Sequence, residues 1–270
     1  MDESYRELIW DIETLPSIVM VYGLYDQNIS PDNIIVESSI ASIAWTFIDA
    51  KGKIDKIQSV SILDDIERFD NSVYDDFYVI DKFHPILKEA NVLVGHNGDN
   101  FDLKVFNWRA RINGFKPTGP KETVDTLKES RKVFKAPSHR LDYKGKAHGV
   151  GGKHEAGKKG LQFIISRYEV DANYRAKAIT AVRELEEYNI RDVELLHEVY
   201  KEERVYYKRR PNIQKYVQKK GICPDCGSKL INNGTRAVGQ SVYQRYRCTS
   251  VACSGEFRDK KPLFTVDRVK

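Results

Sequence analysis

The four cysteines of this chain all lie after residue 220, and they constrain the fold of the C-terminal part more tightly than any other feature. Cys223 and Cys226 form a C-x₂-C pair, and Cys248 and Cys253 form a C-x₄-C pair. Because disulfides are rare in cytosolic proteins, two such pairs favour a tetrahedral Zn²⁺ site with four thiolate ligands. Closed four-thiolate coordination is typical of structural zinc. The alternatives to a zinc site are four unliganded thiols and cysteines with a redox function.

The sequence between the two cysteine pairs indicates a small β-structure. Asn233-Gly234 is a hairpin-turn signal, and Val242 to Arg247 is rich in strand-forming residues. Residues 221–270 therefore resemble a zinc ribbon that holds one structural Zn²⁺.

Arginine and aromatic residues interleave in the second predicted strand of this ribbon. The run Tyr-Gln-Arg-Tyr-Arg-Cys is similar to ribbons in transposases and other DNA-associated proteins. Arg245 and Arg247 are expected to pair with phosphates, and Tyr243 and Tyr246 to stack on bases. Because ribbon ends also mediate protein contacts, the partner is either nucleic acid or another protein.

The charge of the chain is strongly segregated. Residues 201–270 hold 17 Lys and Arg against 6 Asp and Glu, a net +11, whereas residues 1–200 carry a net −6. A basic segment of this kind favours an acidic partner, with nucleic acid the commonest case, although a solvated basic face without a partner gives the same pattern.

Length and composition bound the architecture. A chain of 270 residues has room for one domain of about 200 residues and a small module, and is too short for a polymerase. No apolar run reaches the roughly 18 residues of a membrane-spanning helix, and the opening Met-Asp-Glu-Ser lacks the order of a signal peptide. We therefore expect a cytoplasmic protein without membrane contact.

Hydrophobic patterning predicts an α/β body in residues 1–205. Three early strands suggest an antiparallel meander, and a later strand followed by a helix suggests a crossover. The expected strands are 7–13, 38–49, 54–61 and 92–95, and the expected helices are 74–90, 100–112 and 174–208. The basic, glycine-rich segment 128–160 is the least regular, and we expect Gly145 to weaken any helix there.

Three acidic segments carry the candidate chemistry. Asp11 and Glu13 share one face of the first strand, where they outline a metal site or simply a solvated turn. Asp102 opens a helix, where a favourable interaction with the helix dipole explains it equally well. Asp192 lies four residues after Tyr188 on an apolar helix face, so it needs a cation or an arginine partner.

The order of these segments resembles the three exonuclease motifs of the DEDD superfamily, the ribonuclease H-like, DnaQ-like 3′–5′ exonucleases. The sequence resembles the subgroup of this superfamily that has tyrosine in the third motif, and the similarity is greatest to proofreading domains of family B DNA polymerases. It covers roughly residues 7–200 and rests on these residues: Trp10 to Thr14, Asn97, Phe101 to Leu103, Arg109-Ala110, Asp125 to Leu127, Leu141-Asp142, Gly149 to Lys153, Tyr188 and Asp192.

The resemblance implies a ribonuclease H-like mixed sheet flanked by helices, and a two-metal nuclease site. Asp11, Glu13, Asp102 and Asp192 would bind two Mg²⁺ or Mn²⁺ ions, and Tyr188 would orient the attacking water. Asn97 would contact the terminal nucleotide. His96 is a second candidate for substrate contact, with a hydrogen bond at the strand end as the alternative, and Asp99 is a rival for the position of Asp102.

We therefore expect an exonuclease domain at 1–205, a basic helical connector at 206–220 and a zinc ribbon at 221–270. The expected activity is that of a free-standing 3′–5′ exonuclease acting on single-stranded DNA 3′ ends, with the ribbon aiding nucleic-acid binding. The alternatives are a 3′–5′ exoribonuclease, and a non-catalytic nucleic-acid-binding or assembly protein on an exonuclease scaffold.

Overall fold

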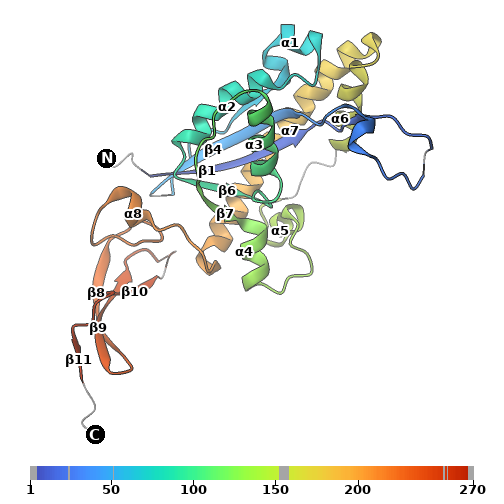
Figure 1. Ribbon diagram of the computed structural model, residues 1–270. Coiled ribbons are helices and arrows are strands. Elements are labelled where there is room, and N and C mark those ends of the chain that lie inside the picture. Colours follow the sequence, from blue (N-terminus) through green and yellow to red (C-terminus); the bar gives the residue numbers. More distant parts are fainter. Residues whose placement is uncertain are drawn as a thin grey trace.

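A mixed sheet with the strand order β5-β4-β1-β6-β7 forms the body of the protein (Figure 1). The computed structural model describes residues 5–23, 25–50, 52–151, 158–251, 253 and 255–266. The strands of this sheet are β1 (Arg6–Thr14), β4 (Ile40–Asp49), β5 (Gln58–Ser61), β6 (Val92–Gly95) and β7 (Glu122–Asp125). The predicted meander is confirmed, since β1, β4 and β5 pair antiparallel, while β6 runs parallel to both β1 and β7.

Strand β1 joins the antiparallel and parallel halves, and it is buried on both faces. Leu8, Ile9, Trp10 and Ile12 are each at most 3% exposed. A strand covered on both faces reads as a nearly continuous apolar run, so any polar residue within β1 has to be satisfied inside the protein.

Helices cover both faces of the sheet (Figure 1). On one face lie α2 (Phe77–Glu89) and α3 (Asp102–Ile112), where Trp10 stacks on Phe83 with 5.3 Å between ring centroids. On the other face, the C-terminal half of α7 (Arg175–Glu203) packs its apolar side chains against Ile9 and Val94. The predicted mixed α/β architecture is confirmed.

Short elements complete the body. They are β2 (Ile18–Val19), β3 (Ile34–Val36), α1 (Ile66–Asn71), α4 (Thr126–Val133), α5 (Leu141–Ala147), α6 (Lys158–Tyr168), α8 (Ile213–Val217), and the 3₁₀ turns η1 (Pro31–Asn33), η2 (Ile62–Asp64), η3 (Ala172–Tyr174) and η4 (Arg204–Tyr206). Among the described residues, no helix is long and apolar enough to cross a membrane.

The expectation of an irregular segment at 128–160 is wrong over much of its length, because α4 and α5 lie there. Gly145 does not break α5. A Cβ at this position would come within 2.4 Å of both the Leu195 side chain and the Gly151 carbonyl, so the glycine lets α5 approach α7. Of the Gly149 to Lys153 motif, Gly152 and Lys153 lie outside the described residues.

The C-terminal module is a small antiparallel sheet centred on β9 (Ser241–Cys248). Its other strands are β8 (Leu230–Val238), β10 (Glu256–Arg258) and β11 (Phe264–Thr265). The predicted hairpin turn at Asn233-Gly234 is wrong, since β8 continues through it and the chain turns at Gly239-Gln240. Asn233 and Gly234 instead form a β-bulge, where the register shifts between Asn232 and Thr235 and Gly234 takes φ +72°.

The module contacts the body through its first cysteine loop. The guanidinium of Arg204 donates to the Asp225 carbonyl at 3.0 Å and to Glu7 of β1 at 3.4 Å. Gly227 lies so close to the body that a Cβ would come within 2.8 Å of the Ala50 carbonyl. The cysteine loop is therefore fixed against the sheet.

Candidate metal centre

Asp11 and Glu13 point to the same side of β1, as strand alternation requires. Glu13 is 1% exposed, and Asp11 is partly exposed. Asn189 of α7 donates to Asp11 Oδ2 at 3.2 Å. Both carboxylates therefore lie at the boundary between β1 and the helix that covers it.

Asp192 of α7 completes a group of three acids. Carboxylate oxygens of Asp11, Glu13 and Asp192 all lie within 4.8 Å of one another. Asp192 is 3% exposed, and Tyr188, one helical turn earlier, is 8% exposed. Acids from β1 and α7, which lie far apart in the sequence, thus form one cluster of oxygen donors.

Asp102 lies beside this cluster but is not one of its three members. Its Oδ1 accepts a hydrogen bond from the backbone N–H of Ile12, between the two acids of β1, at 3.1 Å. Burial raises the pKa of Asp102 to about 7, and the charge of Glu13 acts in the same direction. A cation near this carboxyl would favour its ionised form.

A tight turn aims Asp102 at β1. Gly95 and Gly98 approach so closely that a Cβ on Gly95 would lie 3.1 Å from the Gly98 Cα, and Asn97 adopts φ +70°. The rival acid, Asp99, forms an ion pair with Lys128 at 3.0 Å. Asp102, and not Asp99, is therefore the acid of this turn that is bonded to β1.

Lys158 is the residue that sequence reasoning missed. Its Nζ donates to Glu13 Oε1 at 3.0 Å and lies 5.6 Å from the Tyr188 ring centroid, while Gln162 donates to Glu13 Oε2 at 3.2 Å. Burial lowers the pKa of Lys158, but the charges of Glu13 and Asp11 outweigh it and leave this pKa raised. The signal in the sequence was the basic segment 128–160, which contains Lys158.

The donor set suits a divalent cation. Carboxylate oxygens are the ligands that Mg²⁺ and Mn²⁺ prefer, and the acids are too close together to be ionised without a compensating charge. The ammonium of Lys158 supplies one such charge in this structure. The cluster therefore can bind metal.

The remaining predicted substrate residues of the body, His96 and Asn97, lie in the turn between β6 and α3. The backbone N–H of Asn97 donates to Asp125 Oδ1 at 3.1 Å, and its side-chain oxygen accepts from Asn100 at 3.2 Å. His96 Nδ1 is hydrogen-bonded to the Thr126 hydroxyl at 2.9 Å, which agrees with the alternative of a histidine held at the strand end.

The four cysteines converge as the sequence predicts. Their Sγ atoms lie within 4.8 Å of one another, and all four are free thiols. The Sγ atoms of Cys226 and Cys248 are 3.4 Å apart, and the hydrogen bond between Cys223 and Cys226 lowers the pKa of Cys226 while it raises the pKa of Cys223. A cluster of four sulfurs that favours a thiolate can hold a zinc ion.

Arg245 and Arg247, the predicted phosphate contacts, both lie on β9. Arg247 is exposed, whereas the guanidinium of Arg245 forms an ion pair with Glu256 at 2.7 Å. Arg245 would have to exchange this partner for a phosphate.

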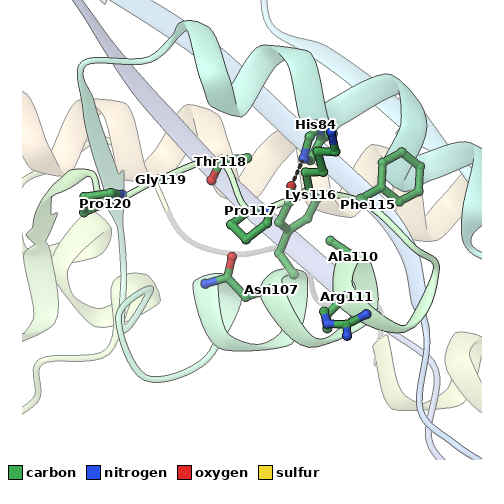
Figure 2. A pocket seen from close by; sticks show the side chains of 11 residues that line it. His84, Asn107, Ala110, Arg111, Phe115, Lys116, Pro117, Thr118, Gly119 and Pro120 are labelled. Atoms are coloured by element: carbon green, nitrogen blue, oxygen red, sulfur yellow. Dashed lines mark hydrogen bonds between the residues drawn. The ribbon is translucent and has the colours of Figure 1, made fainter.

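A separate pocket of about 340 Å³ lies between α2, α3 and the loop that follows α3 (Figure 2). His84 is held there by the Lys116 carbonyl at 2.7 Å, and Asn107 and Arg111 of α3 lie at its side. None of the clustered acids lines this pocket, so it is not part of the metal centre.

No protein-family model and no curated protein matches this chain. Among solved structures, the chain is similar to the family B DNA polymerase from the hyperthermophilic archaeon Pyrobaculum calidifontis, with a TM-score of 0.44 and 16% sequence identity. The match covers 73% of this chain and 24% of that polymerase chain.

Proposed function

We propose that this protein is a metal-dependent 3′–5′ exonuclease that hydrolyses single-stranded DNA from its 3′ end. The observation that carries the proposal is the convergence of Asp11, Glu13 and Asp192 from two distant elements. Tyr188 lies one turn from Asp192, and Asp102 is tied to the same stretch of β1. This is the combination of residues that the resemblance to DEDD exonucleases requires.

Each residue has a role that its environment supports. Asp11, Glu13 and Asp192 bind two Mg²⁺ or Mn²⁺ ions together with Asp102. Such ions supply an activated water and stabilise the leaving 3′ oxygen. Because a tyrosine hydroxyl has a reference pKa near 10 and is a poor base at neutral pH, Tyr188 orients the water rather than removing its proton, and Asn97 contacts the terminal nucleotide.

The C-terminal module contributes binding rather than chemistry. Four thiolates around one Zn²⁺ leave no open coordination position, so the zinc of the ribbon at 221–270 is structural. The excess of positive charge after residue 200 favours attraction of the polynucleotide backbone. Arg245 and Arg247 are the phosphate contacts of this module.

The test is cleavage of end-labelled strands. Wild-type protein with Mg²⁺ or Mn²⁺ should shorten 5′-labelled single-stranded DNA stepwise from its 3′ end, and should be inactive without these ions. Asp192→Asn should lower the rate at least about 100-fold, because a lost ligand misplaces the reacting groups. Tyr188→Phe should lower it less.

Asp99→Asn is the control, since it neutralises an acid close to Asp102 in the sequence that pairs with Lys128 instead of joining the cluster. It should stay within a few-fold of wild type. Equal rates for Asp192→Asn and wild type would place the chemistry elsewhere. Faster cleavage of an RNA strand of the same sequence would instead assign the protein as an exoribonuclease.

A further inference from the structure

A cavity of about 590 Å³ lies between α8 and the ribbon sheet, next to the first cysteine loop and apart from the acidic cluster. Its volume falls within the range of about 300 to 1,000 Å³ of small-molecule binding sites. The lining side chains that matter are Tyr246, Phe257, Gln214, Asn232, Lys220 and Lys260.

Two aromatic rings form one wall of this cavity. Phe257 of β10 is paired with Tyr246 of β9, so both side chains lie on the same face of the sheet. The Phe257 ring lies over Gly255, where a Cβ would come within 2.7 Å of it. The Tyr246 hydroxyl donates to Asp259 at 3.2 Å. Both rings are therefore held in position.

The other polar groups around the cavity are amides, cations and the carboxylate of Asp259, which accepts from Tyr246. Lys220 and Lys260 are exposed. The amides of Gln214 and Asn232 already take part in hydrogen bonds within the protein, so a base edge would be a further partner for them. Aromatic rings stack with any nucleobase, amides hydrogen-bond to base edges, and lysines neutralise phosphates. The cavity thus combines the three kinds of contact that an unpaired nucleotide makes.

The opposite face of the sheet carries the exposed Arg247 together with two arginines that are already paired. Arg258 and Arg245 are paired on that face, where Arg245 is bound to Glu256 and the guanidinium of Arg258 lies 4.1 Å from the Tyr243 ring centroid. Their cationic groups are engaged within the module. The cavity face requires no exchange of partners at Lys220 or Lys260.

We infer that this cavity binds a single-stranded polynucleotide, with a base stacked on Tyr246 and Phe257 and flanking phosphates at Lys220 and Lys260. The inference rests on the proposed function in that both take nucleic acid as the ligand. It goes further in that it assigns a second binding site, remote from the acidic cluster.

Neighbouring lysines provide matched controls. Lys219 and Lys261 are exposed, adjacent to Lys220 and Lys260, and do not line the cavity. The probe is a fluorescent oligothymidylate with phosphorothioate linkages, which reports binding without cleavage, and its affinity for the full chain is measured by anisotropy at several salt concentrations. Lys220→Gln and Lys260→Gln should each weaken binding at least threefold and reduce the salt slope by about 0.7.

Lys219→Gln and Lys261→Gln should change the affinity less than twofold. Phe257→Leu keeps an apolar side chain but removes the stacking surface, and should weaken binding at least fivefold while the melting temperature stays within a few degrees of wild type. An oligouridylate probe shows whether the site accepts RNA as well as DNA.

Equal effects of the cavity and control lysines would overturn the inference, as would the absence of binding by the wild type. Displacement of the strand by a polyglutamate peptide at equal concentration would also overturn it, in favour of an acidic peptide ligand.

Binding that depends on the cavity without cleavage would contradict the proposed function alone. Cleavage that is independent of the cavity residues, together with equal binding by all variants, would contradict this inference alone.

Discussion

The ammonium of Lys158 lies 3.0 Å from Oε1 of Glu13, inside the group of acids that is the candidate metal centre. Lys158 and Glu13 are 145 positions apart, and the side chain of Lys158 is 41% exposed whereas that of Glu13 is 2% exposed. A partly exposed cation on a buried acid can be exchanged for another cation without breaking the core.

Lys158→Met should therefore tighten Mn²⁺ binding. The variant removes a cation that competes with the metal for Glu13, and a partly exposed ion pair contributes up to about 1 kcal/mol, equivalent to about fivefold in Kd. Isothermal titration calorimetry of the full chain, with Zn²⁺ first added to saturate the cysteine cluster, measures the Kd for Mn²⁺. Lys159→Met removes the same charge from an exposed neighbour and should leave the Kd within twofold. Weaker Mn²⁺ binding by Lys158→Met would show that the lysine supports the metal instead.

Two glycines in helices should respond to alanine with opposite signs. Gly145→Ala places a methyl group 2.4 Å from Leu195, so it should lower the free energy of unfolding by about 1 to 3 kcal/mol. A Cβ added to Gly160, in α6, would meet open space, so Gly160→Ala should raise the free energy of unfolding by about 0.5 to 1 kcal/mol. Urea unfolding followed by circular dichroism compares the stabilities of the two variants. A Gly145→Ala variant more stable than wild type would contradict the close packing of α5 on α7.

The stability of the body should depend on the ionisation of Glu203. This carboxylate, 1% exposed, accepts hydrogen bonds from Lys144 at 2.7 Å and from His148 at 2.8 Å. Burial raises the pKa of Glu203, but these bonds outweigh it and leave the pKa below its ordinary value of 4.5. The stabilisation is therefore complete above about pH 4.5 and is lost as the pH falls through the folded-state pKa.

Glu203→Gln should accordingly cost about 3 kcal/mol at neutral pH and progressively less below about pH 4.5. Urea midpoints at several pH values measure the difference. Glu202→Gln, at an exposed neighbouring position, should follow the wild type at every pH. A difference between Glu203→Gln and wild type that stays constant down to pH 3 would mean that the charge of Glu203 does not contribute.

If Zn²⁺ occupies the cysteine cluster, its removal should unfold the C-terminal module while β1 stays paired with its neighbours. The module is held by the cysteine cluster, whereas β1 pairs with β4 on one side and with β6 on the other. After treatment with a zinc chelator, hydrogen exchange should speed up across β8 to β10. The amides of Leu8 to Trp10 should stay protected.

Equal loss of protection in β1 would contradict this prediction. It would show that unfolding of the module spreads to β1 through Arg204, which bridges Glu7 and Asp225, in spite of the strand pairing of β1. Arg204→Met tests this coupling, because it removes the bridge and should restore the hydrogen-exchange protection of β1 in the chelator-treated protein.

The sequence by itself determined the features that depend on local periodicity and residue type. Alternation in β1 placed Asp11 and Glu13 on one face, helical spacing placed Tyr188 with Asp192, and the cysteine spacing predicted that four sulfurs would converge. Only the tertiary structure decided how segments distant in the chain meet. In the tertiary structure Asp102 accepts a hydrogen bond from the Ile12 amide, and Lys158 forms an ion pair with Glu13. Asn233-Gly234 forms a bulge within β8 rather than a hairpin turn. These features follow from packing and strand register, which depend on neighbours that no local pattern identifies.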